Sequence, residues 1–346
     1  MRVGGGLSSA RVLLWWALIL ALGGCIRAVP PSLAPASELT YRTDDGWISA
    51  IRHFPGDGPP VLLVHGMGAN HYNWDYHPDV SLAHHLQQEG WDVWVPELRG
   101  DPGSIPPYSK ARGAIAFDDY ATKDLPQIVD AVLGATGESG LFYVGHSMGG
   151  MLLYTSLAQF PEKIRAGVAI SSPSSFEHPH KIYGLGRLIG WTLGGHGRLH
   201  FEGAARLAAP LGKSNLLVGR LGNRKNLDWG IVKGMSKVAL TDLPKPLVRQ
   251  ALSWVKSGEL TTLDGKPWLR PAPTPLLVLC GVKDKVVPEP DVASTCDLFE
   301  NCTYQQLSVS QGFSFDYGHI DPVMGRTAKS EVYPLVSAFL DAHRSD

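Results

Sequence analysis

Residues 141–150 read LFYVGHSMGG, and this stretch decides the fold class. The apolar run 141–144 predicts a buried strand, and a helical pattern begins at residue 148. Between them lies Gly145-His146-Ser147-Met148-Gly149, a G-x-S-x-G pentapeptide. A serine in a sharp strand-to-helix turn is exposed above the sheet, and the N-terminus of the following helix favours developing negative charge. The pattern predicts Ser147 as a nucleophile; the alternative is a glycine-rich turn without chemistry.

Apolar runs alternate with helical patterns along most of the chain. The strand-like runs are 61–64, 91–96, 141–144, 166–170, 276–280 and 304–309, and the helical patterns are 79–89, 117–133, 148–160, 289–299 and 328–342. Such alternation predicts an α/β fold with a mostly parallel, twisted sheet flanked by helices. Ahead of it, residues 39–54 hold an Asp-Gly turn between two strand-like runs and predict an antiparallel hairpin.

The alternation stops between residues 174 and 273 and resumes directly afterwards. We therefore expect a core formed by residues 39–173 and 274–346, interrupted by a helical cap insertion over 174–273. The glycine- and leucine-rich part, residues 183–193, is a candidate lid. A later helix is expected around 246–257.

The sequence resembles the α/β-hydrolase fold family over about residues 40–342. In that family a catalytic serine, acid and histidine follow in chain order, with the acid and histidine on loops after late strands. The segment Gly281-Val282-Lys283-Asp284-Lys285-Val286-Val287-Pro288 matches the family's strand–GxxDxxVP loop, so the resemblance implies Asp284 as the acid. Asp291 and Asp264 are weaker candidates, and the alternative for Asp284 is a turn-capping role.

The same resemblance implies the histidine and the oxyanion hole. His319 lies in the loop Phe315-Asp316-Tyr317-Gly318-His319-Ile320-Asp321, before the last helical pattern. The loop His65-Gly66-Met67-Gly68 follows the run 61–64, and the amides of Met67 and Met148 are expected to bind an oxyanion. His65 and His146 are interpreted as scaffold residues, and Asp316 and Asp321 as residues that shape the loop.

Together these residues predict a serine hydrolase that cleaves carboxylic esters through an acyl-enzyme intermediate. The chemistry needs no metal and no organic cofactor. The loops HGMGANHYNWD and DYGHIDPVMG look like those of a lipase-like subgroup that includes the acid lipases, which implies a small-molecule ester or a lipid as substrate. The alternatives are a non-catalytic binding lipoprotein on a hydrolase scaffold, and a haloperoxidase-like or C–C hydrolase activity.

The charge is balanced overall, with 31 Lys+Arg against 32 Asp+Glu and a net charge of −1. This balance argues against a nucleic-acid partner bound through bulk charge. The charge is unevenly distributed, however: the insertion 174–273 carries 15 basic and 6 acidic side chains, a balance of +9 that leaves −10 for the rest of the chain. The basic excess is interpreted as a solvated surface, and the alternative is a surface that meets anionic headgroups.

The N-terminus has the layout of a secretory signal peptide. Residues 12–22 are apolar, Arg2 and Arg11 precede them, and the stretch is too short for a spanning helix of about 20 residues. Leu22-Gly23-Gly24-Cys25 resembles the bacterial lipobox, which implies a signal peptide over 1–24 and lipidation of Cys25. The alternatives are an ordinary cleaved signal and an uncleaved anchor.

The segment after Cys25 and the other cysteines complete this expectation. Residues 25–38 are expected to form a flexible tether, because they are rich in Pro, Ala and Ser. The protein is then exported and lipid-anchored to the bacterial cell envelope, on the periplasmic or outer-membrane side. In such an oxidising compartment Cys296 and Cys302 are candidates for a disulfide, whereas Cys280 is expected to be buried.

Overall fold

An eight-stranded sheet forms the centre of the computed structural model, which describes residues 27–178, 195–208 and 218–344. The strand order is β1-β2-β4-β3-β5-β6-β9-β10. The strands are β1 (Ser37–Arg42), β2 (Ile48–Phe54), β3 (Pro60–Val64), β4 (Asp92–Pro96), β5 (Leu141–His146), β6 (Ile164–Ile170), β9 (Leu276–Gly281) and β10 (Cys302–Leu307). The pairs from β4 to β10 are parallel, and β2 is antiparallel to both β1 and β4. The predicted hairpin and mostly parallel sheet are confirmed.

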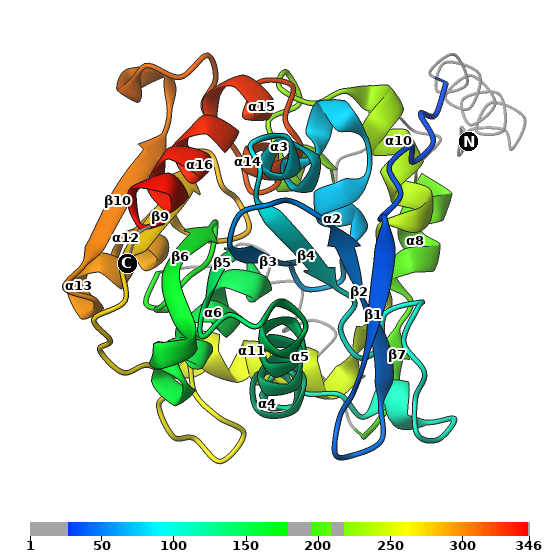
Figure 1. Ribbon diagram of the computed structural model, residues 1–346. Helices are drawn as coiled ribbons and strands as arrows, with labels where there is room; N and C mark the ends of the chain where they lie inside the picture. Colours follow the sequence, from blue (N-terminus) through cyan, green and yellow to red (C-terminus); the bar gives the residue numbers. More distant parts are fainter. Residues whose placement is uncertain (1–26, 179–194, 209–217, 345–346) are drawn as a thin grey trace, which may run out of the picture.

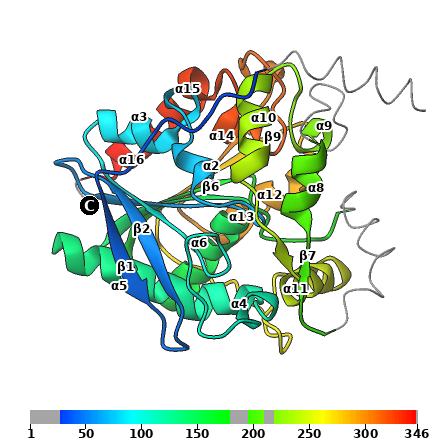
Figure 2. The same ribbon diagram turned by 90° about the vertical axis from the view of Figure 1, so that its right-hand side faces the viewer.

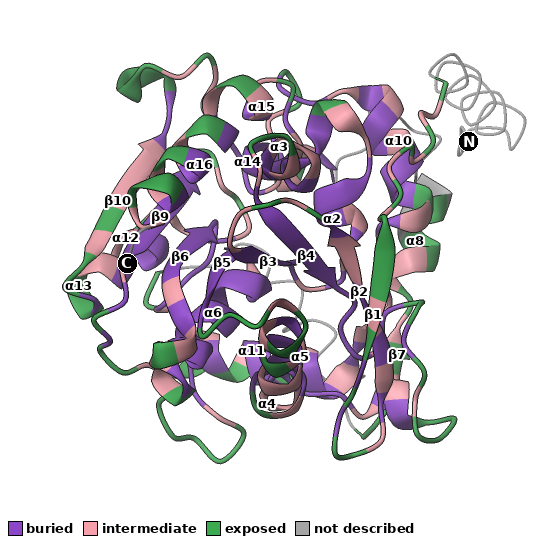
Figure 3. Cartoon of the chain, in the orientation of Figure 1, coloured by how far each residue is buried: buried purple, intermediate pink, exposed green. Residues whose placement is uncertain are grey.

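Helices cover both faces of this sheet, as the alternation predicted (Figure 1). On one face lie α5 (Leu125–Thr136), α6 (Met148–Gln159) and α11 (Lys245–Ser257), which contribute Ile128, Leu152 and Trp254 to one apolar core. On the other lie α3 (Leu82–Gln88) and α16 (Tyr333–Ala342), which contribute Leu86 and Leu340 to a second core. The central strands are buried on both sides (Figure 3), so burial of apolar surface holds the sheet between the two layers.

The described part of the insertion is mostly helical, with α8 (Phe201–Ala208), α9 (Val218–Leu221), α10 (Trp229–Val238) and α11. It also contains one small pairing that the sequence analysis did not predict, between the two-residue strands β7 (Arg198–Leu199) and β8 (Leu243–Pro244). Figure 2 shows α8, α10, α11 and β7 on the same side of the molecule. The candidate lid, residues 183–193, lies outside the described residues.

The N-terminal segment differs from the predicted flexible tether. Residues 1–26, including Cys25, lie outside the described residues, but Val29 donates its amide to Gly230 O at 2.9 Å and Ser32 donates to Tyr76 O at 2.9 Å. The Tyr76 hydroxyl donates back to Val29 O, and β1 already begins at Ser37. From Val29 onward the tether is therefore hydrogen-bonded to the folded part of the chain. Its backbone amides and carbonyls find their partners on Gly230 and Tyr76.

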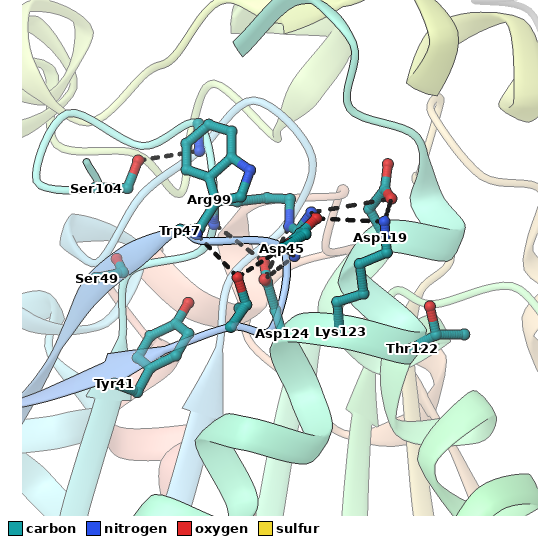
Figure 4. A network of polar contacts seen from close by, with 12 residues as sticks. Tyr41, Asp45, Trp47, Ser49, Arg99, Ser104, Asp119, Thr122, Lys123 and Asp124 are labelled. Atoms are coloured by element: carbon teal, nitrogen blue, oxygen red, sulfur yellow. Dashed lines mark hydrogen bonds and ion pairs between the residues drawn. The ribbon is translucent and has the colours of Figure 1, made fainter. Parts of the chain in front are cut away.

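A buried arginine ties the hairpin turn to the segment that leads into α5 (Figure 4). Arg99, just after β4, donates through Nε to Asp124 Oδ1 at 2.8 Å and through Nη1 to Asp45 Oδ2 at 2.8 Å. Asp124 ends a π-helical turn, Tyr120–Asp124, that leads into α5. Because Arg99 is 2% exposed, the two carboxylates neutralise a charge that would otherwise be costly to bury.

Two further expectations concern cysteines and membrane spans. Cys296 and Cys302 form a disulfide in the structure, and Cys280 is buried with a free thiol. Within the described ranges, no helix has both the length and the apolar character needed to cross a bilayer.

Candidate active site

Ser147 occupies the sharp turn between β5 and α6. Its φ of 53° and ψ of −117° define a backbone conformation that residues other than glycine rarely adopt. The surrounding packing must therefore stabilise this strained conformation. The flanking glycines make the turn possible: a Cβ on Gly145 would lie 2.3 Å from Gly149 C, and a Cβ on Gly149 would lie 2.1 Å from Val64 O. The backbone thus requires glycine on both sides of the serine.

The structure brings Ser147, His319 and Asp284 together from three separate parts of the chain. His319 Nε2 lies 3.0 Å from Ser147 Oγ, and His319 Nδ1 lies 2.7 Å from Asp284 Oδ2. The Asp284 side chain is fully buried and that of His319 is 7% exposed. An ionised carboxylate only accepts hydrogen bonds, so Nδ1 carries the proton and Nε2 is free to accept one from the serine hydroxyl.

Asp284 is held in place by its own loop. Its Oδ1 accepts the amides of Val286 at 2.8 Å and Val287 at 2.9 Å, which leaves Oδ2 facing the histidine. The weaker acid candidates have other partners. Asp291 Oδ1 lies 2.8 Å from His178 Nδ1, and Asp264 forms an exposed ion pair with Lys266. Of the three, Asp284 is the one that contacts His319.

The His319 loop is supported by the insertion, which the sequence analysis did not foresee. The His319 amide donates to Leu221 O at 2.9 Å, and Asp321 accepts the amides of both Gly318 at 3.0 Å and Asn223 at 2.9 Å. Burial raises the pKa of Asp321 to about 6, against the opposing effect of these amides. Asp316, in turn, accepts the Val309 amide at 2.9 Å, so both loop aspartates shape the loop as expected.

The loop after β3 lies beside the serine. A Cβ on Gly66 would be 3.1 Å from Ser147 Cβ, and Gly68 turns the chain with a φ of +71°. Thr241 of the insertion donates its amide to Gly68 O at 2.9 Å and fixes the loop from above. Within the described ranges, neither the Met67 nor the Met148 amide has a hydrogen-bond acceptor, so both are available to an oxyanion.

His65 and His146 occupy scaffold positions, as interpreted. Burial lowers the pKa of His65, but the ion pair of its Nε2 with Asp101 at 2.9 Å outweighs this and the pKa is raised overall. Burial, reinforced by the charge of His319, lowers the pKa of His146 to about 3, so its ring stays neutral. The His146 Nε2 lies 3.0 Å from His319 O and donates to it, which joins the serine turn directly to the histidine loop.

We expect His146→Phe to lower kcat about tenfold with little change in KM. The phenyl ring keeps the edge-on packing against Trp74. It leaves the buried carbonyl of His319 without a donor, which destabilises the active arrangement of the histidine loop by about 1–3 kcal/mol. Steady-state kinetics on a soluble ester measure the effect. His146→Gln, which retains a donor, should recover part of it; equal kcat for wild type and His146→Phe at equal Tm would contradict the positioning role.

His65, Glu97 and Asp101 place their ligand atoms within 4.8 Å of one another, a cluster that the sequence analysis did not predict. Burial, together with Asp101, raises the pKa of Glu97 well above its usual value, which favours the neutral form of this carboxyl. Asp101 is already used by His65 and by the Leu98 amide, at 2.7 Å. The cluster therefore acts as a hydrogen-bonded support for the loop after β3. The insertion also holds two closely spaced histidine pairs, His178/His180 and His196/His200. His180 lies outside the described residues, and His200 contacts Asp242 at 3.2 Å.

Comparison with known proteins agrees with this fold. The family model of the alpha/beta hydrolase fold matches residues 59–320, and the chain belongs to this family. Among curated proteins, the human Lipase member N is 27% identical over 167 residues, covering 43% of this chain and 42% of the relative. Human gastric triacylglycerol lipase is 29% identical over 177 residues, covering 46% of this chain and 44% of the relative. The chain thus spans less than half the length of these relatives.

Solved structures share the fold at low sequence identity. A membrane phospholipase A, described as a bacterial virulence factor, aligns with a TM-score of 0.61 at 18% identity and covers 98% of this chain and 93% of its own. A thermophilic esterase from Thermogutta terrifontis aligns with a TM-score of 0.58 at 16% identity, covering 89% of this chain and 100% of its own. At such identity these structures establish the fold alone.

Proposed function

We propose that the protein is a serine hydrolase that cleaves carboxylic esters, a lipase or esterase. The observation that carries the proposal is His319, whose two ring nitrogens meet Ser147 Oγ at 3.0 Å and Asp284 Oδ2 at 2.7 Å. The available amides of Met67 and Met148 and the lipase relatives support the same reaction. A non-catalytic binding role on this scaffold needs no such arrangement.

The geometry suggests a two-step acyl transfer. His319 takes the proton of Ser147 as the oxygen attacks the ester carbonyl, while Asp284 orients the ring and stabilises its positive charge. The amides of Met67 and Met148 bind the tetrahedral oxyanion. His319 then protonates the leaving alcohol, and it later activates the water that releases the acyl group from the serine.

A chain-length series of p-nitrophenyl esters, from acetate to palmitate, tests the proposal. We expect turnover that Ser147→Ala abolishes, and labelling of the wild type by a fluorophosphonate probe. A short-chain optimum would identify an esterase and a long-chain optimum a lipase. Absence of both turnover and labelling in folded protein would overturn the hydrolase assignment.

We also propose that Cys25 carries a lipid anchor that holds the protein at the bacterial cell envelope. The support is the lipobox-like Leu22-Gly23-Gly24-Cys25 behind an apolar segment. Cys25→Ser should move the protein from the membrane fraction to the soluble fraction after cell lysis and ultracentrifugation. Cys280→Ser is the matched control and should leave the protein at the membrane. Unchanged fractionation of Cys25→Ser would refute the anchor.

A further inference from the structure

A pocket opens beside the loop that follows β3, next to the proposed oxyanion hole. The residues that line it include those of the loop, the residue after the proposed nucleophile and three arginines. The lining residues that matter here are Gly66, Gly68, Met148, Arg99, Arg112 and Arg198. A group bound in this pocket would therefore lie close to an ester carbonyl held at Ser147.

Two of these arginines are held near each other by the backbone. Gly197 donates its amide to Gly113 O at 2.8 Å, and a Cβ on Gly113 would lie 2.8 Å from Gly197 Cα. Arg112 and Arg198 are the chain neighbours of these two glycines. Burial lowers the pKa of Arg112, and the positive charge of Arg198 lowers it further, although the negative charge of Asp101 partly opposes both effects. The two guanidinium groups therefore repel each other.

Two carboxylates, Asp101 and Asp242, also line the pocket, but each already has other partners. Arg99 is paired with Asp124 and Asp45. Arg112 donates to the carbonyl oxygens of Gly100 at 2.6 Å and Asp101 at 2.7 Å, and within the described ranges it pairs with no carboxylate.

Arg198 is paired only loosely. Its Nη1 lies 3.6 Å from Asp242 Oδ2, and its side chain is 40% exposed. Asp242 Oδ2 also accepts from His200 Nδ1, at 3.2 Å, and its Oδ1 accepts the amide of Glu202, at 3.3 Å. Asp242, the carboxylate paired with Arg198, thus already has other partners.

We propose that this pocket binds an anionic oxyacid group of the substrate, a phosphodiester or a carboxylate, and that the enzyme prefers esters carrying such a group near the scissile bond. The inference rests on the proposed ester hydrolysis at Ser147. A planar guanidinium matches the oxygens of carboxylate and phosphate, and an anion between Arg112 and Arg198 would remove their mutual repulsion. Arg198 is thus the basic residue of the insertion that lies beside the proposed active site.

Matched ester pairs test the preference. The first pair is p-nitrophenyl valerate and mono-p-nitrophenyl glutarate, which have the same chain length and differ in a terminal carboxylate. The second pair is dioctanoylglycerol and dioctanoylphosphatidylglycerol in neutral detergent micelles. We expect kcat/KM to favour the anionic member of at least one pair by about tenfold, the effect of one charge-assisted contact. Preference in the first pair alone identifies a carboxylate, and in the second a phosphodiester; no preference in either overturns the proposal.

Arg198→Gln is the decisive variant, because the side chain is partly exposed and its loss should not disturb folding. Its kcat/KM for the preferred anionic ester should fall about tenfold more than that for the neutral partner, mainly through KM. Arg198→Lys should restore part of the difference. Arg206→Gln, an exposed arginine of the same insertion that pairs with Glu202, is the control and should behave like wild type. An unchanged anionic preference in Arg198→Gln overturns the proposal.

Binding without turnover separates this inference from the proposed function. Titration calorimetry of sn-glycerol 3-phosphate and of glutarate, each into wild type and Arg198→Gln, should show binding of at least one anion that the variant weakens about tenfold. If no ester is hydrolysed but the anion binds through Arg198, the hydrolase assignment fails and the anion site stands. If esters are hydrolysed but neither anion binds, the anion site fails alone.

Discussion

Ser147→Ala is expected to lower kcat for ester hydrolysis by about 10⁴- to 10⁶-fold without unfolding the protein. The serine oxygen is the group that His319 Nε2 faces at 3.0 Å, and no other hydroxyl is hydrogen-bonded to that nitrogen within the described ranges. Alanine keeps the Cβ that the strained turn already accommodates, so Tm should change by no more than a few degrees. Measurement of kcat on p-nitrophenyl butyrate, with thermal melts of both proteins, tests this expectation.

The chain offers a matched control in Ser171, at the end of the neighbouring strand β6. Its φ of 52° makes it the other described non-glycine residue with a positive φ, and its hydroxyl is buried without a partner among the described residues. Ser171→Ala therefore removes a hydroxyl from the same kind of backbone but without a histidine beside it. It should retain wild-type turnover. Equal losses in both variants would point to a structural effect and refute Ser147 as the nucleophile.

The serine turn and the buried strands were predictable because their signals are local. Gly145 and Gly149 are required by contacts within a few residues or with the adjacent β3, and the buried strands appear directly as apolar runs. The positions of Asp284 and His319 came from the family resemblance. The structure adds that the three side chains meet, which no sequence spacing could establish.

The contacts that hold the site from above were not predictable. Leu221 and Thr241 support the histidine loop and the loop after β3 through bonds between backbone atoms, and Asn223 donates its backbone amide to the Asp321 carboxylate. Such bonds use main-chain atoms that every residue possesses, so no residue type marks them in the sequence. The insertion is accordingly part of the active-site framework in its described segments.

The tether was mispredicted for a related reason. Its Pro-, Ala- and Ser-rich composition indicates that the segment forms no helix or strand alone, but composition says nothing about partners elsewhere. Val29 and Ser32 find theirs on Gly230 and Tyr76, which are distant in sequence. The uneven charge of the chain, in contrast, was visible in the sequence. One of the basic residues responsible, Arg198, lines the pocket beside the proposed oxyanion hole.

Asp284→Asn is expected to lower kcat about 10⁴-fold while leaving the geometry of the site intact. Oδ1 accepts the amides of Val286 and Val287, so the oxygen of an asparagine would take that position and its NH₂ group would face His319. A donor at that place makes His319 Nδ1 the acceptor and moves the ring proton to Nε2. The ring then has no lone pair with which to take the proton of Ser147.

Asp291→Asn is the matched control for this substitution. Asp291 is also fully buried and also lies 2.8 Å from a histidine nitrogen, Nδ1 of His178, but that histidine has no contact with the serine. The control is expected to lose stability, measured as a lower Tm, yet its kcat should stay within a few-fold of wild type, as should that of Asp264→Asn. The pH profile separates the cases further, because only a wrong tautomer at His319 should leave the residual rate dependent on hydroxide. A large kcat loss in Asp291→Asn with full activity in Asp284→Asn would reassign the acid, since the two carboxylates differ in which histidine they orient.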